Sequence, residues 1–489
     1  MDEKVLRVLY VASEAGPFVK IGGLGDVAGT LPPELFALSP DDIDGWRVDI
    51  RLVIPYHPAV EKSYHFEKPL TTVTLRPKSG DLHMDVYQSE LNGMPVYLID
   101  GDLITAAEKV YSFRPEEDMP KFAAFSFAAL ALAKQIGFQP DIINANDWHT
   151  ALSVYALRKI RRRDPFFRNT KTVFSVHNLP YMGSECKQIL RDYGFFVWPH
   201  WQLPRWGRSF AMPLGLLAAD HINAVSPNYA REIQTPEFGC SLEKFLARRS
   251  DSISGIINGL DYSSWNPATD PDVVQNYDAE HIDQRVNNKL ALLKEFELEE
   301  DTTMPLIIVV SRMDQQKGMD IVFEALRKMT DVPWQAILLG TGAEEIEKSA
   351  RQLEADYPER VKAAIRFDGK LARRMYAAGD VIPLPSNYEP CGLTQLIGMR
   401  YGCVPVANEV GGFADTIRDT RDPATWTGFL FQQNTPEVLA ETMKAAFLVY
   451  QQPELWKQIQ ANGMRADFSW KRSALKYVHL YRVLKEGGK

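Results

Sequence analysis

Short apolar runs of strand length alternate with helix-length segments along most of the chain. Val and Ile occur on both faces of many of these runs, which is typical of strands buried in a parallel sheet. The runs that predict strands are Val5–Ala12, Val48–Pro55, Val96–Asp100, Asp141–Ala145, Thr172–His177, His221–Ser226, Gly255–Asn258, Leu306–Ser311, Ala336–Leu339, Ile365–Phe367, Val381–Leu384 and Val404–Ala407. The segments that predict helices are Pro120–Ile136, Ala151–Arg162, Gly318–Met329, Glu344–Tyr357, Ala372–Ala378 and Leu393–Tyr401. This alternation favours the α/β class, with doubly wound, Rossmann-like sheets.

A polar stretch at residues 262–303 interrupts the alternation, which then begins again. The stretch contains Trp265-Asn266-Pro267, Asp270-Pro271-Asp272 and Glu299-Glu300-Asp301. Turn-forming and charged residues grouped in this way are typical of a loop between folded segments. The sequence therefore predicts two doubly wound domains facing a cleft, residues 1–262 and residues 263–464.

Composition and charge exclude several classes of protein. The 55 Lys and Arg residues against 63 Asp and Glu residues give a net charge of −8, so the basic excess of a nucleic-acid binder is missing. The longest nearly apolar run, Phe122–Ala133, is shorter than the ~20 residues of a membrane span and predicts a buried helix. The chain starts with acidic residues rather than a signal peptide, and its four cysteines are scattered. We expect a cytoplasmic protein that binds neither nucleic acid nor membrane.

Functional residues are expected directly after strands, because ligands of doubly wound sheets bind at the carboxyl ends of the strands. The first such segment, Lys20–Val27, places Gly22, Gly23 and Gly25 beside Lys20. Glycines let backbone N–H groups approach a phosphate closely, and the lysine adds a full charge. The segment also fits a dinucleotide-binding fingerprint, but it lies about ten residues beyond the strand, which disfavours a nicotinamide-dependent dehydrogenase. The alternative is a turn that serves packing alone.

The segment after the strand Leu306–Ser311 suits a diphosphate leaving group. It carries two cations five residues apart, Arg312 and Lys317. Positive charge placed where negative charge develops is usually the largest catalytic contribution. The alternative is a pair of solvated charges.

The segment Pro385–Gln395 begins at a strand end and runs into a helix. The first-turn N–H groups at Gly392, Leu393 and Thr394 are candidates for phosphate binding, and Glu389 lies beside them. Cys391 has no base nearby in the sequence, so we expect it to pack or make contact rather than to act as a nucleophile. The alternative is a Pro-Cys-Gly turn with an incidental glutamate.

Two strand ends in the first half carry candidates for a sugar site. Asp147 and Trp148 follow the strand Asp141–Ala145. A carboxylate beside an exposed aromatic ring is a common way to hold a sugar, whereas a helix start capped by Asp147 is the structural alternative. His177 and Asn178 end the next strand, where His177 either faces the cleft or is a satisfied polar group.

Two acidic pairs and one basic run are expected to bind no ligand. Asp42-x-Asp44 and Asp100-x-Asp102 match a metal-binding pattern that is common by chance, and neither has further carboxylates or a His nearby. The basic run Arg158–Arg163 lies at a predicted helix end, where cations meet the helix dipole favourably. We expect this run to be a solvated face.

Taken in order, these segments resemble the bacterial glycogen synthase and plant starch synthase family. Its opening signature, Lys-x-Gly-Gly-Leu-Gly-Asp-Val, is present at Lys20–Val27, and Glu-Pro-Cys-Gly-Leu-Thr-Gln is present at Glu389–Gln395. The further matches are Asp147-Trp148-His149, His177-Asn178, Asn258-Gly259-Leu260-Asp261, Ser311-Arg312 and Gln316-Lys317-Gly318. The resemblance extends from Lys20 to the Asp467-Phe468-Ser469-Trp470 region.

The resemblance implies a GT-B fold and a glucosyltransferase that retains the anomeric configuration. The implied reaction transfers glucose from ADP-glucose to the non-reducing end of an α-1,4-glucan, with no metal and no cofactor. The C-terminal helix, residues 465–489, is expected to complete the N-terminal catalytic and acceptor domain. Residues 263–464 are then the nucleotide-sugar-binding domain.

The resemblance also implies roles for single residues. Lys20, Arg312 and Lys317 contact the donor diphosphate; Glu389 lies near the donor glucose, His177 beside the reacting centre and Asp147 in the sugar pocket. The implied catalytic residues are Glu389, His177, Arg312, Lys317 and Asp147. The implied donor-binding residues are Lys20, Gly22, Gly23, Cys391, Gly392, Leu393 and Thr394, with Asn178 and Trp148 on the acceptor side. A front-face reaction needs cationic side chains at the diphosphate, whereas a double displacement needs a carboxylate nucleophile that no motif here places.

Three positions depart from the family pattern, all on the nucleotide side. Asn387 stands where the family usually has Arg, Ile397 where it commonly has Tyr, and Val410 where it usually has Thr. These departures leave ADP-, UDP- and GDP-glucose open as donors. The alternatives are a related GT-B transferase with another nucleotide sugar or acceptor, and a glucan-binding protein with weakened catalysis.

Overall fold

Two units with separate cores make up the chain. The computed structural model describes residues 4–487 except 61–63, 65, 108 and 198–199. Unit 1 consists of Met1–Gly259 and Trp470–Lys489, and unit 2 of Leu260–Ser469. The boundaries expected from the sequence, after residues 262 and 464, lie a few residues from these. In the described part of the chain, no helix is both long and apolar enough to cross a membrane.

The sheet of unit 1 is parallel except at one edge. Its strand order is β3-β4-β5-β2-β1-β6-β7-β8-β9, and β4 pairs antiparallel with both β3 and β5. The strands are β1 (Lys4–Val11), β2 (Trp46–Pro55), β3 (Thr71–Leu75), β4 (Leu82–Leu91), β5 (Met94–Ile99), β6 (Ile142–Asn146), β7 (Lys171–Val176), β8 (His221–Ala224) and β9 (Ile253–Gly255). The helices are α1 (Gly23–Ala37), α2 (Asp102–Thr105), α3 (Pro115–Gln135), α4 (Asp147–Ile160), α5 (Lys187–Asp192), α6 (Ala211–Ala218), α7 (Pro227–Glu232), α8 (Glu243–Ala247) and α17 (Trp470–Lys485).

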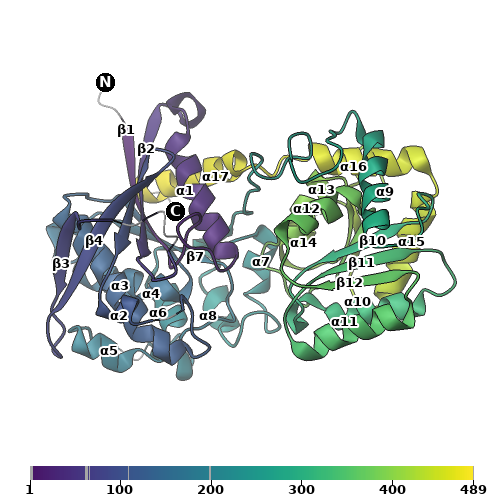
Figure 1. Ribbon diagram of the computed structural model, residues 1–489. Helices are drawn as coiled ribbons and strands as arrows, with labels where there is room; N and C mark the ends of the chain where they lie inside the picture. Colours follow the sequence, from purple (N-terminus) through teal and green to yellow (C-terminus); the bar gives the residue numbers. More distant parts are fainter. Residues whose placement is uncertain (1–3, 61–63, 65, 108, 198–199, 488–489) are drawn as a thin grey trace. The chain divides into compact units, whose positions relative to one another are not determined.

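Unit 2 is a parallel sheet covered on both faces, with α10 and α11 on one face and α12 and α13 on the other (Figure 1). Its strand order is β12-β11-β10-β13-β14-β15. The strands are β10 (Leu306–Val310), β11 (Gln335–Gly340), β12 (Val361–Ile365), β13 (Val381–Leu384), β14 (Val404–Asn408) and β15 (Phe429–Phe431). The helices are α9 (Arg285–Glu295), α10 (Met319–Lys328), α11 (Glu344–Asp356), α12 (Gly369–Ala378), α13 (Thr394–Arg400), α14 (Gly411–Thr416), α15 (Pro436–Tyr450) and α16 (Pro453–Arg465).

The strand orders define one topological switch point in each sheet. In unit 1, β1 and β6 are neighbours, but the chain leaves β1 toward β2 and leaves β6 toward β7. In unit 2, β10 and β13 are neighbours, and the chain leaves them toward β11 and β14. Ligands of doubly wound sheets bind in the crevice that opens at the carboxyl ends of such strands.

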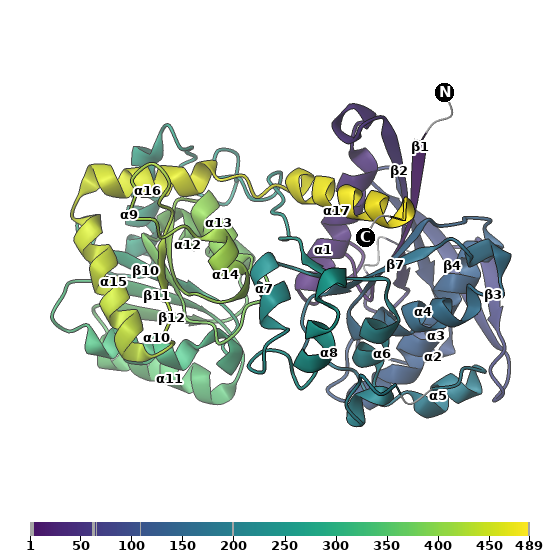
Figure 2. The same cartoon turned by 180° about the vertical axis from the view of Figure 1, so that it is seen from behind.

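Helix α17 joins unit 1 although more than two hundred residues separate it from the rest of that unit. Figures 1 and 2 show it beside α1, and its residues from Trp470 to Tyr481 contribute to the core under β1 and β2. Tyr477 accepts a hydrogen bond from the amide of Asn223 at 2.9 Å, and Tyr481 donates one to Asn144 at 2.9 Å. These buried pairs fix α17 on the sheet, because an unpaired polar group there would be costly.

Most of the predicted elements are present, with several differences. The buried helix expected at Phe122–Ala133 lies within α3. The predicted strands at Ile365–Phe367 and Gly255–Asn258 are wrong in position, since β12 ends at Ile365 and β9 ends at Gly255. The predicted helix Ala151–Arg162 starts earlier, at Asp147, and Ala372–Ala378 starts at Gly369. Strands β3, β4 and β15 were not expected, since β3 and β4 alternate polar with apolar residues at the sheet edge and β15 has three residues.

Candidate active site

The loop after β1 is organised by a buried carboxylate, Glu14. This side chain is 2% exposed and accepts hydrogen bonds from the backbone N–H groups of Ile21 and Gly22 and from the hydroxyl of Tyr111 at 3.0 Å. Burial raises the pKa of Glu14, and the hydrogen bonds offset part of that rise. The backbone N–H of Gly22 is therefore directed at Glu14, while the donor-binding roles of Gly22 and of Gly23, the first residue of α1, stay predictions.

Lys20 is exposed at the start of the same loop. Its Nζ lies 2.6 Å from Oδ1 of Asp26, in the first turn of α1. Exposed ion pairs contribute little to stability, so this contact leaves the ammonium free to exchange partners. The position suits an anion contact at the switch point of unit 1.

Asp147 ties the ends of β6 and β7 together. It is the first residue of α4, has a φ of 53°, and is 6% exposed. Its Oδ1 accepts the backbone N–H groups of His177 at 2.8 Å and Asn178 at 3.4 Å. Burial raises the pKa of Asp147 to about 7, these hydrogen bonds lower it, and the charge of Glu14 raises it. A carboxyl group with such a pKa beside a strand end is characteristic of functional sites.

His177 is held in one orientation by Asn146. Asn146 Nδ2 donates to the carbonyl of Val11 at 2.8 Å, which turns its Oδ1 toward the hydroxyl of Tyr10 at 3.0 Å and toward Nε2 of His177 at 2.9 Å. The proton of the neutral ring is therefore on Nε2, and Nδ1 is an acceptor. Burial lowers the pKa of His177 to about 4, so the imidazole is neutral at pH 7.

Trp148 does not have the exposed ring expected for sugar stacking. It is 5% exposed and packs with its ring centroid 4.2 Å from that of His149 and 5.3 Å from that of Phe122. The expectation is wrong because Trp148 lies in the first turn of α4 against α3, where its apolar surface is buried. Asn178 differs: it is half-buried, and its Oδ1 has no hydrogen-bond partner among the described residues.

In unit 2, Asp314 organises the loop after β10. Its Oδ1 accepts the backbone N–H of Lys317 at 3.0 Å, and its Oδ2 lies 2.8 Å from the guanidinium of Arg312. Gly318 follows with a φ of 65°, and a Cβ atom there would lie 2.1 Å from the carbonyl oxygen of Pro385. The loop is therefore packed directly on the segment that follows β13, which brings both sides of the switch point together.

Lys317 and Glu389 contact each other at this switch point. Lys317 Nζ and Glu389 Oε2 form an ion pair, and the hydroxyl of Ser386 donates to the same carboxylate oxygen at 3.2 Å. The Glu389 side chain is 9% exposed and that of Lys317 is 19% exposed. The two residues were predicted separately from motifs 72 positions apart, and the fold makes them one charged unit.

The glycine pair at the start of α14 supports Glu389. A Cβ atom at Gly411 would lie 1.8 Å from the carbonyl oxygen of Glu389, and one at Gly412 would lie 1.9 Å from that of Cys391. The N–H of Gly412 donates to the Glu389 carbonyl at 3.0 Å. Because only hydrogen fits at these two positions, the Gly-Gly segment shapes the turn that carries Glu389.

The predicted phosphate-binding turn follows at the start of α13, whose N-cap is Leu393 and whose first residue is Thr394. Cys391 is buried, and the Gln395 side chain donates to the carbonyls of Cys391 at 3.0 Å and Gly392 at 3.2 Å. The turn is thus fixed from within, while the roles of Cys391, Gly392, Leu393 and Thr394 stay predictions.

The three departures from the family pattern have different surroundings. Asn387 donates to the carbonyl of Gln315 at 2.7 Å and accepts from Asn434 at 3.0 Å, so it braces the Lys317 loop instead of adding a cation. Ile397 is buried in α13, and Val410 is the N-cap of α14, where it offers no hydroxyl.

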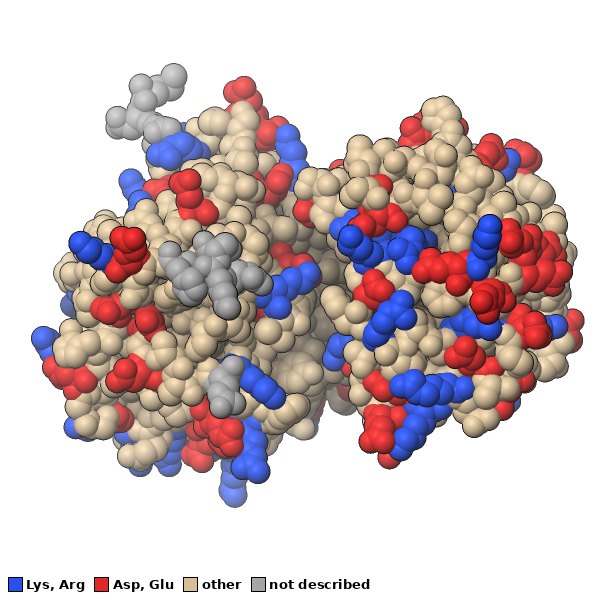
Figure 3. Space-filling model, in the orientation of Figure 1, with Lys and Arg blue, Asp and Glu red and all other residues tan. Residues whose placement is uncertain are grey.

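The acidic pair Asp42-x-Asp44 bonds to α17. Asp42 lies 2.9 Å from Lys471 and Asp44 lies 2.7 Å from Arg482. Across the described ranges, no group of three or more His, Cys, Asp or Glu side chains is placed to hold a metal ion. On the face shown in Figure 3, basic and acidic side chains are interspersed over both units.

Two residues of the site were not predicted from the sequence, Glu14 and Asp314. Glu14 could have been found, because it is a carboxylate three residues after the apolar end of β1, where a charge is retained only with partners. Asp314 could also have been found, because an Asp three residues before Lys317 fits the pattern of an N-cap. In the structure it caps the 3₁₀ turn Gln315–Lys317.

Comparison with known proteins places this geometry in a family. The model of the starch synthase catalytic domain matches residues 7–248, and that of glycosyl transferases group 1 matches residues 293–463. Glycogen synthases of Thermotoga maritima and Syntrophotalea carbinolica are 38% and 36% identical, each over 98% of this chain and 98% of the relative. The solved catalytic domain of starch synthase IV from Arabidopsis thaliana, bound to ADP and acarbose, has a TM-score of 0.86 and 28% identity, covering 98% of this chain and 99% of that one. The chain therefore belongs to the glycogen synthase and starch synthase family of glycosyltransferases and has the GT-B fold of two Rossmann-like domains.

Proposed function

We propose that the protein extends an α-1,4-glucan by transferring glucose from a nucleotide-glucose, with ADP-glucose as donor and retention at the anomeric carbon. The observation that carries the proposal is the Lys317–Glu389 pair at the switch point of unit 2, with Arg312 on the adjoining loop. Membership of the glycogen synthase family supports it, as does the ADP bound by the starch synthase IV relative.

The pair explains how one cluster can serve both parts of a nucleotide-sugar. An ammonium group has three donors, of which Lys317 uses one on Glu389, so two are left for a diphosphate. The second oxygen of Glu389 is left for the sugar. As the glycosidic bond breaks, negative charge grows on the diphosphate and positive charge on the sugar ring. Lys317 and Arg312 stabilise the first charge and Glu389 the second, which lowers the barrier without a covalent intermediate.

Unit 1 is proposed to bind sugar and a further part of the donor. The free Oδ1 of Asn178 and the carboxyl of Asp147 are suited to sugar hydroxyls. Neutral His177 offers hydrogen bonds rather than charge, because its pKa of about 4 excludes an imidazolium at pH 7. Lys20 is proposed to contact phosphate, with Gly23 beside it.

A donor panel tests the proposal. The purified protein is incubated with glycogen and labelled ADP-, UDP- or GDP-glucose, and incorporation into glucan is measured. We expect the highest kcat/KM with ADP-glucose, and product that releases its label on α-1,4-specific digestion. A preference for UDP- or GDP-glucose would identify a related transferase with another donor. Binding of glycogen without turnover of any donor would identify a glucan-binding protein.

Matched variants locate the chemistry. Glu389→Gln keeps the size of the side chain and removes its charge, while Glu409→Gln makes the same change at an exposed glutamate of unit 2. We expect Glu389→Gln to lower kcat by about 10²-fold or more and Glu409→Gln to leave it unchanged. A fully active Glu389→Gln enzyme would contradict the role of the charge.

The reaction is proposed to take place in the cytoplasm. All four cysteines are unpaired, which is typical of a reducing compartment. Cell fractionation with activity measured in each fraction tests this.

A further inference from the structure

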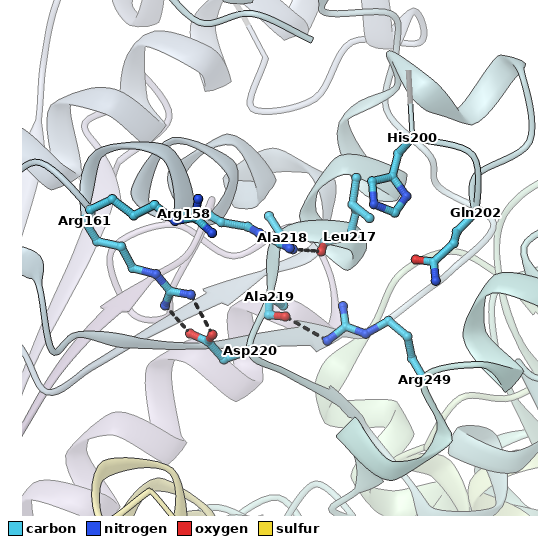
Figure 4. A pocket seen from close by; sticks show the side chains of 10 residues that line it. Arg158, Arg161, His200, Gln202, Leu217, Ala218, Ala219, Asp220 and Arg249 are labelled. Atoms are coloured by element: carbon cyan, nitrogen blue, oxygen red, sulfur yellow. Dashed lines mark hydrogen bonds and ion pairs between the residues drawn. The ribbon is translucent and has the colours of Figure 1, made fainter. Parts of the chain in front are cut away.

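The basic run at the end of α4 is mostly exposed, as expected from the sequence, but three of its arginines also line a cavity. The cavity holds about 400 Å³ and is lined by Arg158, Arg161, Arg162, His200, Gln202, Leu217, Ala218, Ala219, Asp220 and Arg249. Figure 4 shows Arg158 and Arg161 entering from α4 and Arg249 from the opposite side, around the segment that joins α6 to β8. Four cations thus converge on one concave site in a protein with a net charge of −8.

This cavity is remote from the candidate active site of unit 1. Asp147 is the first residue of α4, and Arg161 lies just past its last turn. At 1.5 Å per residue the two positions are about 20 Å apart. Asp220 directly precedes β8, so the cavity lies at the amino ends of the strands, opposite the switch point.

The positive charge of the cavity is only partly neutralised. Asp220 is the one carboxylate in its lining, and both of its oxygens pair with Arg161, at 2.7 and 2.9 Å. The carboxyl ends of α4 and α6 add about −0.5 each, so four guanidinium groups and one carboxylate leave a net charge of about +2. Burial lowers the pKa of Arg158, and the nearby charges of Arg161 and Arg162 lower it further. Burial also lowers the pKa of Arg249, and the charge of Arg158 lowers it further.

The arginines are held in place and keep donors free. Arg158 donates to the Leu217 carbonyl, and Arg249 donates to the carbonyls of Leu216 and Ala219, the latter at 2.8 Å, and to Ser252 at 3.2 Å. A guanidinium group has five N–H donors, so both retain some for a ligand. The side chain of Arg162 is exposed and makes no hydrogen bond or ion pair with any residue that the structure describes. Capping α6 therefore accounts for part of this cluster and leaves Arg162 unexplained.

We propose that this cavity binds a phosphate-bearing anion. A phosphate monoester carries a charge of about −1.5 to −2 at pH 7 and three acceptor oxygens, which matches the net charge and the convergent guanidinium donors. The volume exceeds that of a phosphate group alone, so a small organic phosphate such as a sugar phosphate fits as well as inorganic phosphate. The buried Nδ1 of His200, which has no partner among the described residues, is a further group for such a ligand. The site is independent of the proposed transferase reaction, because it lies at the amino ends of the strands and the switch point lies at their carboxyl ends.

Calorimetric titration tests the proposal on the full chain, with ADP saturating throughout so that the donor site is filled. The probes are inorganic phosphate, glucose 6-phosphate and glucose. We expect saturable binding of the phosphate probes, none of glucose, and weaker binding at higher salt because exposed charges are screened. Tighter binding of glucose 6-phosphate would identify a sugar-phosphate site, and equal binding of inorganic phosphate a free-phosphate site. Absence of saturable binding of both phosphate probes would overturn the proposal.

Neighbouring arginines provide the matched control. Both arginines are exposed, but Arg162 lines this cavity whereas Arg163 lines another, with Lys159, Asp164 and Tyr193. Arg162→Gln should weaken phosphate binding about tenfold, since it removes a charged hydrogen-bond donor, and Arg162→Lys should weaken it less. Arg163→Gln should bind as the unaltered protein does. An equal loss of phosphate affinity in Arg162→Gln and Arg163→Gln would mean that phosphate responds only to the overall surface charge. That result would refute a specific site in this cavity. Unchanged melting temperatures verify that each variant is folded.

Discussion

Replacing Asp147 by Asn should stabilise the protein at pH 8 while impairing its activity. The wild-type carboxyl is 6% exposed, and its burial raises its pKa from 3.8 to about 7. Asn keeps the acceptor oxygen that receives the N–H groups of His177 and Asn178, and it tolerates the φ of 53° at this position. The substitution therefore removes the charge with little other change.

The sign and size of the effect follow from proton linkage. Between pH 4 and 7 the folded protein keeps a proton on Asp147 that the unfolded chain loses. The unfolded state then binds fewer protons, so the free energy of unfolding falls as the pH rises through this window and levels off above the folded pKa. A difference of about three pKa units corresponds to about 4 kcal/mol. The variant has no charge to bury and escapes this loss.

Thermal melts of both proteins between pH 5 and 8.5 measure the effect. We expect the melting temperature of Asp147→Asn to exceed that of wild type by an amount that grows with pH, reaching on the order of 10 °C above pH 7.5. Burial holds the pKa of His57 at about 3 and that of His177 at about 4, so these two rings stay neutral throughout. The rate of glucan extension should fall, because a charge retained at this cost is expected to serve binding or catalysis.

A half-buried, ion-paired aspartate of unit 1 gives the control. Asp164 pairs with Lys134, which holds the pKa of that carboxyl below its usual value and hence below the tested range. The difference between Asp164→Asn and wild type should therefore not change between pH 5 and 8.5. Neighbouring Glu14, whose pKa burial also raises, is present in both proteins. If Asp147→Asn were less stable than wild type at every pH, or more stable by a constant amount, the charge-burial argument would be refuted.

Three further predictions concern other parts of the site. Trp148→Ala should destabilise the protein by about 3–5 kcal/mol in denaturant or thermal unfolding, since it empties a buried aromatic site; a neutral change would mean that the ring is not packed. Gly318→Ala should weaken ADP binding in calorimetry, because a Cβ atom 2.1 Å from the Pro385 carbonyl must displace the Lys317 loop. Lys317→Met should cost about 3 kcal/mol by leaving Glu389 buried without its partner, and the double variant with Glu389→Gln should cost less than the sum; additive effects would show that the two do not interact.

The hydrophobic pattern was a good guide to central strands and a poor one to the sheet edge. Strands β10 and β13 are buried on both faces and read as continuous apolar runs. Strands β3 and β4 cover only one face with apolar residues, so their alternation of polar and apolar residues gave no such run. A strand was therefore predicted where both of its faces are buried, and missed where only one face is buried.

The sequence by itself determined the class of fold, the order of the functional segments and the chemistry that they carry. Glycine, lysine and carboxylate groups after strand ends can be read from local spacing, because each lies within a few residues of the strand that positions it. Exposure was not determined in this way: Trp148 was expected to face solvent and is buried, since its neighbours Phe122 and α3 come from an earlier part of the chain.

The tertiary structure alone decided which charges meet. Lys317 pairs with Glu389, and Glu14 accepts the backbone N–H groups of Ile21 and Gly22. The arginines at the end of α4 enclose a cavity because α6 and Arg249 fold against them. A charge acts through its distance to other charges and through its burial, and both depend on residues that the sequence separates by 7 to 72 positions.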